Sequence, residues 1–85
     1  LTVIIVNYNV RFFLEQCLHS LYRAASGISM EVIIADNQST DGSAAYIKKL
    51  FPSVKWIQNA KNMGFGAANN IGIRLARGQY TLLLN

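Results

Sequence analysis

The chain has 85 residues and a mass of 9.4 kDa, a length that suits one small domain rather than two. Hydrophobic residues make up 52% of it and charged residues 14%, which excludes an intrinsically disordered chain, because disorder requires low hydrophobicity and high charge. The apolar runs are far shorter than the roughly 20 residues of a transmembrane helix. We expect no signal peptide, because the chain starts in a strand-like run without a basic segment.

Charge and cysteine content narrow the class of protein further. The net charge of +4 suits an anionic small ligand, but no RNA- or DNA-binding signature accompanies it, so we expect no nucleic-acid partner. Cys17 is the one cysteine and cannot form an internal disulfide, which indicates a reducing compartment. His19 is expected at the surface rather than in a metal site, because it lacks further ligands at a suitable spacing.

A strand and a helix are predicted at the start of the chain. Residues 2–6 form a continuous β-branched run, which is typical of a strand buried on both faces of a parallel sheet. From 10 to 25 the apolar residues recur at spacings of three and four, as on one face of a helix, and Gly27 ends it. The residues of that face are Phe13, Leu14, Cys17, Leu18, Leu21 and Tyr22.

Two more helices and three more strands follow. The second strand stops at Asp36, and the helix after it turns Ala45, Tyr46 and Leu50 inward. The third strand alternates in polarity, which predicts an exposed or edge strand, and Gly78 is expected to cap the third helix. The predicted ranges are 31–35, 54–58 and 80–84 for the strands and about 42–50 and 65–76 for the helices.

The predicted order is therefore βαβαβαβ. Such an order gives a Rossmann-like, three-layer α/β/α fold with a mainly parallel sheet. Ligands of these sheets bind outside the carboxyl ends of the strands. Polar residues gather at those ends, in segments 7–9, 36–41 and 59–70 and at Asn85, so this edge of the sheet is the candidate site.

The same strand ends exclude several nucleotide-binding classes. A dinucleotide-binding domain needs a glycine-rich turn after its first strand, whereas residues 7–11 contain no glycine, and no Walker A motif occurs. A receiver domain needs an acidic cluster at the first strand end and an aspartate after the third strand. This chain has Asn7-Tyr8-Asn9 and Asn59 at those places, and it also lacks the Ser/Thr/Gly-rich phosphate loop of a flavodoxin-like domain.

Two strand-end residues each have two interpretations. The Asp36 carboxylate only accepts hydrogen bonds, so it matches the N3–H of uracil or thymine, but it equally suits backbone N–H groups of its own turn. Tyr8 either stacks on a nucleobase or packs over the sheet end, and packing is favoured from the residues alone. Asp41 is expected to cap a helix, and Cys17 to be a buried structural thiol.

The start of the third helix is a second candidate region. Helix N-termini attract phosphate through free N–H groups and the helix dipole. Asn69 and Asn70 in the first turns therefore suit a diphosphate, or they order the loop. Gly64 and Gly66 permit a close backbone approach or a tight turn, and Phe65 is expected to anchor in the core. No nucleophile–base pair or carboxylate dyad is evident.

Four linked motifs resemble the amino-terminal part of a family 2 glycosyltransferase with the GT-A fold. They cover the chain in the family's order and spacing, and the sequence of residues 62–66 resembles the rhamnosyltransferase-like branch most. The motifs occupy residues 3–9, 32–43, 62–72 and 76–80. The resemblance implies that residues 1–85 are an incomplete, truncated GT-A domain of the nucleotide-diphospho-sugar transferase type.

The resemblance also implies where a nucleotide sugar binds. In the family, the first-strand end and its tyrosine border the nucleotide, the acidic residue that ends the second strand reads the pyrimidine base, and the Gly-Phe-Gly helix start lies along the diphosphate and sugar. The matching residues are Val6, Tyr8, Asp36, Gly64, Gly66, Asn69 and Asn70. The implied donor is a UDP-sugar or dTDP-sugar, and the implied acceptor is a glycan or a lipid-linked molecule.

The family's metal and base are expected outside these residues. Relatives hold a divalent metal, Mg²⁺ or Mn²⁺, with an Asp-x-Asp-like motif just after the fourth strand, where Asn85 matches the first position. We therefore expect no metal ligand and no catalytic residue within the chain, and no sugar transfer by it alone. The parent enzyme is expected to be cytoplasmic, peripheral at the membrane, and active in hexosyl or rhamnosyl transfer for cell-surface polysaccharide biosynthesis.

Two further expectations concern the chain as a unit. The alternative function is a small, complete α/β module that binds nucleotides or partners without catalysis. The resemblance implies a spatial strand order of third, second, first, fourth, so residues 80–84 form an exposed apolar edge. Because such edges pair with other chains, we expect self-association through the strand from Tyr80 to Leu84.

Overall fold

The computed structural model describes residues 1–59, 64–77 and 81–84. The side chains of Phe65 and Leu75 are not described either. The predictions made for Gly78, Tyr80, Asn85 and the Phe65 side chain therefore lie outside the described residues.

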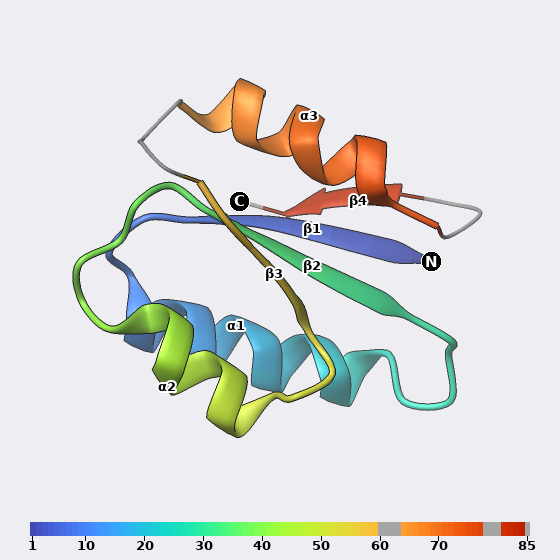
Figure 1. The fold of residues 1–85 in the computed structure, drawn as a ribbon. Coiled ribbons are helices and arrows are strands. Elements are labelled where there is room, and N and C mark those ends of the chain that lie inside the picture. The colour runs from blue at the N-terminus through green and yellow to red at the C-terminus, as the bar shows by residue number, and fades with distance from the viewer. Residues whose placement is uncertain (60–63, 78–80, 85) are drawn as a thin grey trace.

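The described chain forms a three-layer α/β/α fold in the predicted order. The strands are β1 (Thr2–Asn7), β2 (Glu31–Asp36), β3 (Lys55–Gln58) and β4 (Thr81–Leu84), and the helices are α1 (Arg11–Ala24), α2 (Ser43–Leu50) and α3 (Phe65–Leu75). The strands pair in parallel in the order β3-β2-β1-β4, which confirms the expected order. Helices α1 and α2 lie on one side of the sheet and α3 on the other (Figure 1).

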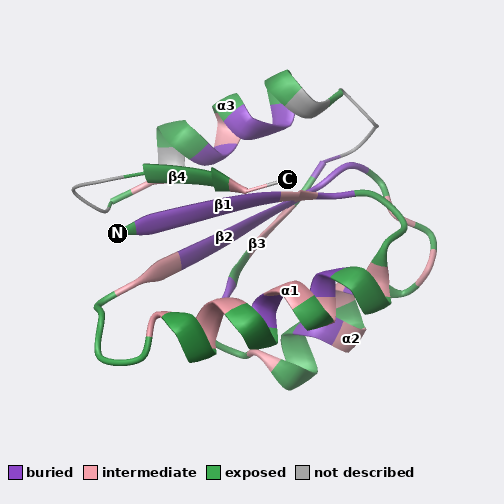
Figure 2. Ribbon diagram, turned by 180° about the vertical axis from the view of Figure 1, so that it is seen from behind, coloured by how far each residue is buried: buried purple, intermediate pink, exposed green. Residues whose placement is uncertain are grey.

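The two central strands are buried on both faces, as their continuous apolar runs predict. Figure 2 shows β1 and most of β2 as buried, between the helices of both layers. Val3 pairs with Val32 and Ile5 with Ile34 in the parallel register. Together with residues from α1, α2 and the approach to β3, these form one apolar core, made of Val3, Ile5, Leu14, Leu18, Val32, Ile34, Ile47 and Val54.

Helix α1 turns a narrower face to the sheet than predicted. Leu14 and Leu18 are buried, but Phe13, expected on the same face, is 65% exposed, so that prediction is wrong. Phe13 precedes Leu14 by one residue and is therefore rotated by about 100° around the helix axis. It lies in the first turn of the helix, where it lines a small cavity with Val6 and Cys17.

Helix α2 presents only part of the predicted face, since Tyr46 is partly buried and packs against the core as expected. Ser43 and Ile47, four residues apart, are buried against the core. Ala45 and Leu50 were expected to point inward, but both are exposed, so that prediction is wrong. Because the helix is only eight residues long, the sequence offers too few apolar positions to fix its rotation.

Helix α3 packs closely on the other face of the sheet because its inner residues are small. Ala68 is fully buried, and a Cβ atom on Gly72 would lie 2.7 Å from Cγ2 of Ile4. Ile4 itself is fully buried in β1. The missing side chain at Gly72 therefore sets how near α3 approaches the sheet.

Strand β4 forms one edge of the described sheet. Among the described strands it pairs with β1 alone. Thr81, Leu82 and Leu83 are exposed, and β4 is drawn as exposed along nearly its whole length in Figure 2. The expected position of an apolar strand at this edge is therefore confirmed.

Replacing Gly72→Ala should destabilise the fold. The new methyl group would meet the branched carbon of a buried side chain, and overpacking of this kind costs about 1–3 kcal/mol. That cost exceeds the gain of about 1 kcal/mol expected for alanine over glycine in a helix. Chemical denaturation measures the difference in the free energy of unfolding.

Gly66→Ala is the matched control for this substitution. Gly66 lies in the same helix, and a Cβ atom there would have no neighbour within 4 Å. We expect this variant to be as stable as the unaltered chain or more so. Equal effects of the two substitutions would contradict the proposed close approach at Gly72.

Candidate functional site

The carboxyl ends of three strands lie side by side. Asn7, Asp36 and Gln58 are register partners at the ends of β1, β2 and β3. Backbone pairing continues one residue further, since the N–H of Asn37 donates to the Asn7 carbonyl at 2.9 Å and that of Asn59 to the Asp36 carbonyl at 2.9 Å. The loops that lead to α1 and α2 leave the sheet at this edge (Figure 1).

The carboxylate of Asp36 is the centre of this edge. Asp36 is 1% exposed, and both of its oxygens accept hydrogen bonds. Oδ1 accepts from Nδ2 of Asn7 at 2.7 Å and from Oγ of Ser39 at 2.6 Å. Oδ2 accepts from the backbone N–H of Ser39 at 2.9 Å and from Nε2 of Gln58 at 2.9 Å. Side chains or backbone from β1, β3 and the following loop thus converge on one buried group.

These contacts bear on the two interpretations of Asp36. The bond from the Ser39 N–H is the turn contact that one of them predicted, and it is present. A carboxylate has about four accepting positions, and donors of the chain occupy that number here. A base N–H would therefore reach Asp36 only by replacing one of them. Gln58 is the exposed partner among them and the easiest to displace.

Asp41 was expected to cap a helix, and its carboxylate bonds to the first N–H group of two helices, although the N-cap positions themselves are Val10 and Gly42. Its Oδ2 accepts from the backbone N–H of Arg11 at 3.0 Å, the first residue of α1. Its Oδ1 accepts from the backbone N–H of Ser43 at 3.1 Å, the first residue of α2, and from the Ser43 hydroxyl. Burial raises the pKa of Asp41, but these hydrogen bonds outweigh it and hold the pKa below its usual value.

A second polar cluster joins the strand ends to α3. Asn37 and Asn59 are 2% and 5% exposed. Nδ2 of Asn59 donates to Oδ1 of Asn37 at 2.9 Å, and Nδ2 of Asn37 donates to the carbonyl of Gly64 at 3.2 Å. Gly64 immediately precedes α3 and has a φ of 83°, in the left-handed region that favours glycine.

The residues predicted at the end of β1 differ in exposure. Val6 is half-buried and pairs with Ala35, next to Asp36. Tyr8 is 51% exposed. An aromatic ring is thus available to solvent beside the end of β2.

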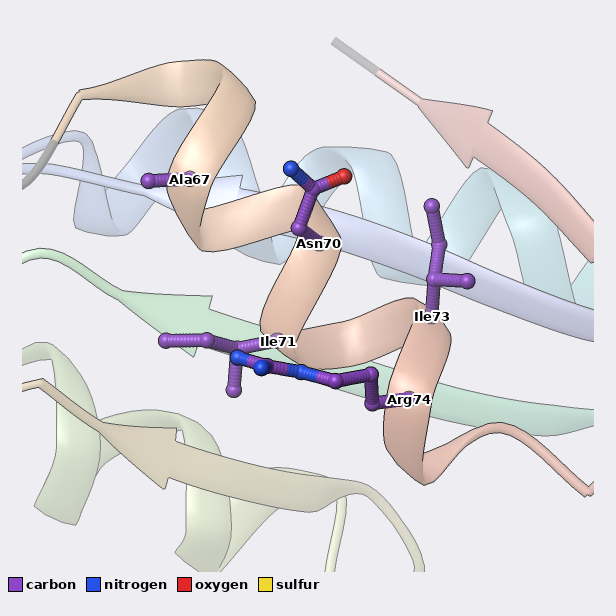
Figure 3. A pocket seen from close by; sticks show the side chains of 5 residues that line it. All are labelled: Ala67, Asn70, Ile71, Ile73 and Arg74. Carbon is purple, nitrogen blue, oxygen red and sulfur yellow. The ribbon is translucent and has the colours of Figure 1, made fainter.

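The residues predicted at α3 do not all face one way. Gly64, Gly66 and Asn70 are exposed, whereas Asn69 is 4% exposed and its Oδ1 has no donor among the described residues. Asn70 instead lines an open cavity of about 620 Å³ on the outer face of the helix (Figure 3). The cavity is lined by Ala67, Asn70, Ile71, Ile73 and Arg74. Asn69 and Asn70 therefore do not share a surface.

Sequence reasoning pointed to the strand ends but not to the residues that organise them. Asn7, Asn37, Ser39, Gln58 and Asn59 make the hydrogen bonds of the two clusters. All of them stand at or just after the carboxyl end of a strand, so the strand-end rule was a sufficient signal for the region. The pairing among them depends on the register of three strands, which no local pattern reveals.

The remaining predictions concern Cys17 and His19. Cys17 is only partly buried, beside a cavity of about 160 Å³, and burial raises the pKa of its thiol. The prediction of a buried thiol is therefore correct only in part. His19 is exposed as expected, with its Nε2 3.4 Å from Oε2 of Glu15.

Neither a metal site nor a membrane span is found in the part of the chain that the structure describes. No group of three or more His, Cys, Asp or Glu residues there could hold a metal ion. The described residues thus do not fit a divalent metal by themselves. None of the helices in the described ranges has the length and apolarity to span a bilayer.

The fold is that of the GT-A class of glycosyltransferases, and comparison with known proteins defines the family. The family model described as "Glycosyl transferase family 2" matches residues 2–85. The chain belongs to this family. The resemblance noted from the sequence motifs is therefore confirmed.

Similar proteins agree with this assignment. The chain is 31% identical over 85 residues to the succinoglycan biosynthesis protein ExoO of Rhizobium meliloti, covering 99% of this chain and 24% of that protein. It is 36% identical over 70 residues to the N-acetylglucosaminyl-diphospho-decaprenol L-rhamnosyltransferase of Mycobacterium tuberculosis, covering 82% of this chain and 22% of that protein. The chain therefore spans about a quarter of the length of these relatives.

A solved structure agrees as well. The mannosyltransferase PcManGT from Pyrobaculum calidifontis, solved in complex with GDP-Man and Mn²⁺, superposes with a TM-score of 0.80 at 25% identity. The match covers 94% of this chain and 25% of that chain. The alternative of a non-catalytic α/β module is not favoured by these matches.

Replacing Asp36→Asn should destabilise the fold strongly. One of the two oxygens becomes an NH₂ group that faces two donors, and each buried donor left unpaired costs about 1–3 kcal/mol. Denaturant titration measures the loss. Glu15→Gln is the control, because Glu15 accepts one hydrogen bond, from Oη of Tyr46 at 2.5 Å, and glutamine keeps an accepting oxygen. A loss for Asp36→Asn no larger than for Glu15→Gln would contradict the central role of the Asp36 carboxylate.

Proposed function

We propose that this chain is the nucleotide-binding part of an enzyme that transfers a sugar from a nucleotide-diphosphate sugar to a glycan or lipid-linked acceptor. The observation that carries the proposal is the family 2 match over residues 2–85, on a sheet whose carboxyl edge gathers polar residues around Asp36. PcManGT, a neighbour in fold, was solved with a nucleotide sugar and supports a donor of this kind.

The base of the nucleotide binds on the Asp36 side of the edge. The exposed Tyr8 offers a ring for stacking on the base. The N3–H of uracil or thymine replaces Nε2 of Gln58 as a donor to Oδ2 of Asp36, which favours a UDP-sugar or a dTDP-sugar. Val6 borders the base from the half-buried end of β1.

The diphosphate and sugar lie along the start of α3. No acidic residue stands in the first turn of this helix, so its N–H groups and dipole favour an anion. Gly64 and Gly66 have no side chains to keep the phosphates away from the backbone. Asn69 and Asn70 belong to the proposed region from different surfaces: the buried Asn69 supports the start of the helix from beneath, and the exposed Asn70 reaches a ligand from the outer face.

The metal, the catalytic base and the location of the enzyme complete the proposal. A divalent metal, Mg²⁺ or Mn²⁺, is held by residues outside the described ranges and offsets the charge of the leaving diphosphate. The catalytic base also lies outside this chain, so the 85 residues alone do not transfer sugar. The parent enzyme works on the cytoplasmic side of a membrane as a peripheral protein.

Nucleotide titrations of the 85-residue chain, followed by NMR, test the proposal. We expect saturable binding of UDP and dTDP that reports on the amides of Tyr8 and Asp36. CDP is the matched ligand, because its pyrimidine has the same size but its N3 is an acceptor that the Asp36 carboxylate disfavours. UDP can donate a hydrogen bond to Asp36 and CDP cannot. A difference of one hydrogen bond predicts about a tenfold preference for UDP over CDP.

Variants separate the role of Asp36 in recognising the base from its role in folding. In Asp36→Asn, the ratio of UDP to CDP affinity should approach one. This ratio does not depend on the folded fraction, since both nucleotides bind only the folded chain. The proposal fails if neither UDP, dTDP nor GDP binds at millimolar concentration, and the assignment of Asp36 to the base fails if the variant keeps the preference.

We also propose that the 85-residue chain associates with a second copy through β4. Leu82 and Leu83 are 45% and 44% exposed, and β4 pairs with β1 alone among the described strands. An unpaired apolar edge strand is a template for another strand. The free edge and both exposed leucines therefore favour an edge-to-edge dimer.

Light scattering after size-exclusion chromatography measures this association. Leu83→Lys should shift the chain toward the monomer, because a charged side chain on an edge strand opposes pairing. Leu50→Lys is the control, since Leu50 is 45% exposed on α2, on another part of the surface. A monomer at high concentration for the unaltered chain would refute the proposal.

A further inference from the structure

Two buried amides connect the strand ends to the first turn of α3. The backbone N–H groups of Asn37 and Asn59 extend the pairing of β1, β2 and β3, with bonds of 2.9 Å to Asn7 and Asp36. Both residues are almost fully buried. They bond to one another, and Asn37 then bonds to the Gly64 carbonyl.

The two hydrogen bonds run in one direction, from Asn59 to Asn37 and from Asn37 to Gly64. A primary amide has one accepting oxygen and one donating NH₂ group. Because Nδ2 of Asn59 donates to Oδ1 of Asn37, the NH₂ group of Asn37 is left to face the Gly64 carbonyl. Asn59 thereby selects which end of the Asn37 amide meets the start of α3.

The Gly64 carbonyl accepts hydrogen bonds from both α3 and the loop after β2. It accepts the N–H of Ala68 at 3.3 Å, a bond of the first helical turn, and Nδ2 of Asn37 at 3.2 Å. Gly64 has a φ that few other residues adopt, and it has no side chain of its own. Its backbone conformation therefore depends on the contacts that its carbonyl makes. Among the described residues, the side chain of Asn37 thus ties the first turn of α3 to the end of β2.

We propose that Asn37 is a positioning residue of the nucleotide site and that Asn59 acts through it. The inference rests on the proposed function and assigns separate roles in it to two adjacent residues. Asp36 organises the base side of the edge, and its neighbour Asn37 organises the phosphate side. A nucleoside diphosphate carries base and diphosphate at a separation set by its ribose, so a site for both needs a fixed spacing between the two sides.

The rest of α3 is held independently of this contact. Ala68 is buried and Gly72 lies against Ile4, so the helix stays docked when Asn37 is changed. What changes is the position of its first turn relative to Asp36. Loss of the amide should therefore weaken the binding of the diphosphate more than the binding of the nucleoside.

The test compares UDP with uridine, and GDP with guanosine, in NMR titrations of the 85-residue chain. For Asn37→Ala we expect the affinity for the diphosphate to fall about tenfold, while that for the nucleoside changes less than about twofold. The ratio of the two affinities is unaffected by partial unfolding, since both ligands bind only the folded chain. Ile47→Val is the stability control, because Ile47 is buried on the other face of the sheet, and it should leave the ratio unchanged.

Asn59→Ala and the double variant test the direction of the effect. Asn59→Ala alone should lower the ratio of diphosphate affinity to nucleoside affinity, because it frees the Asn37 amide to turn. Added to Asn37→Ala it should lower the ratio no further, since its action passes through Asn37. An unchanged ratio in Asn37→Ala, with UDP or GDP still binding the unaltered chain, overturns this inference alone. Absence of binding by all four ligands in the unaltered chain overturns the proposed function and this inference with it.

Discussion

The buried carboxylate of Asp36 is the interaction on which the functional edge of the sheet depends. Burying such a group is costly unless hydrogen bonds replace its water, and here β1, β3 and the loop after β2 provide them. The same contacts hold the loop, because both the N–H and the hydroxyl of Ser39 bond to Asp36. Two residues further on, Asp41 meets the first N–H groups of α1 and α2. One buried charge thus orders a loop that in turn fixes two helices.

The alternation of side chains along β2 explains why the site has two halves. Successive residues of an extended chain point to opposite faces, and the hydrogen bonds of Asp36 and Asn37 follow this rule. Asp36 bonds to the loop that leads into α2, and Asn37 bonds to Gly64, the residue just before α3. Two adjacent residues thereby connect helices on opposite sides of the sheet. A ligand that spans this edge would therefore lie next to both helix layers, through two residues that are adjacent in the sequence.

The sequence allowed prediction of the two central strands from their continuous β-branched runs, and of the edge that carries the site from the parallel βαβ order. The spatial order of the strands was predicted from the family resemblance alone. The rotation of α2 was not predictable, since its apolar residues fit more than one face and only contact with the core selects Ile47. Likewise, neighbouring asparagines at positions 69 and 70 look equivalent in the sequence, and helix docking alone separates the buried one from the exposed one. The amide contacts of Asn37 and Asn59 require the register of three strands, which is a property of the whole sheet.

The place of β1 in the sheet has a consequence for synthesis on the ribosome. β1 meets β2 after one helix, but its other neighbour is β4, with Thr2 paired to Thr81 and Ile5 to Leu84. Chains grow at about 5–20 residues per second, so β1 and β2 can pair several seconds before residues of β4 exist. During that interval the nascent sheet has an open apolar edge along β1 that other nascent chains or chaperones can bind. The length of this vulnerable interval is set by the position of β4 along the chain, and not by the stability of the finished sheet.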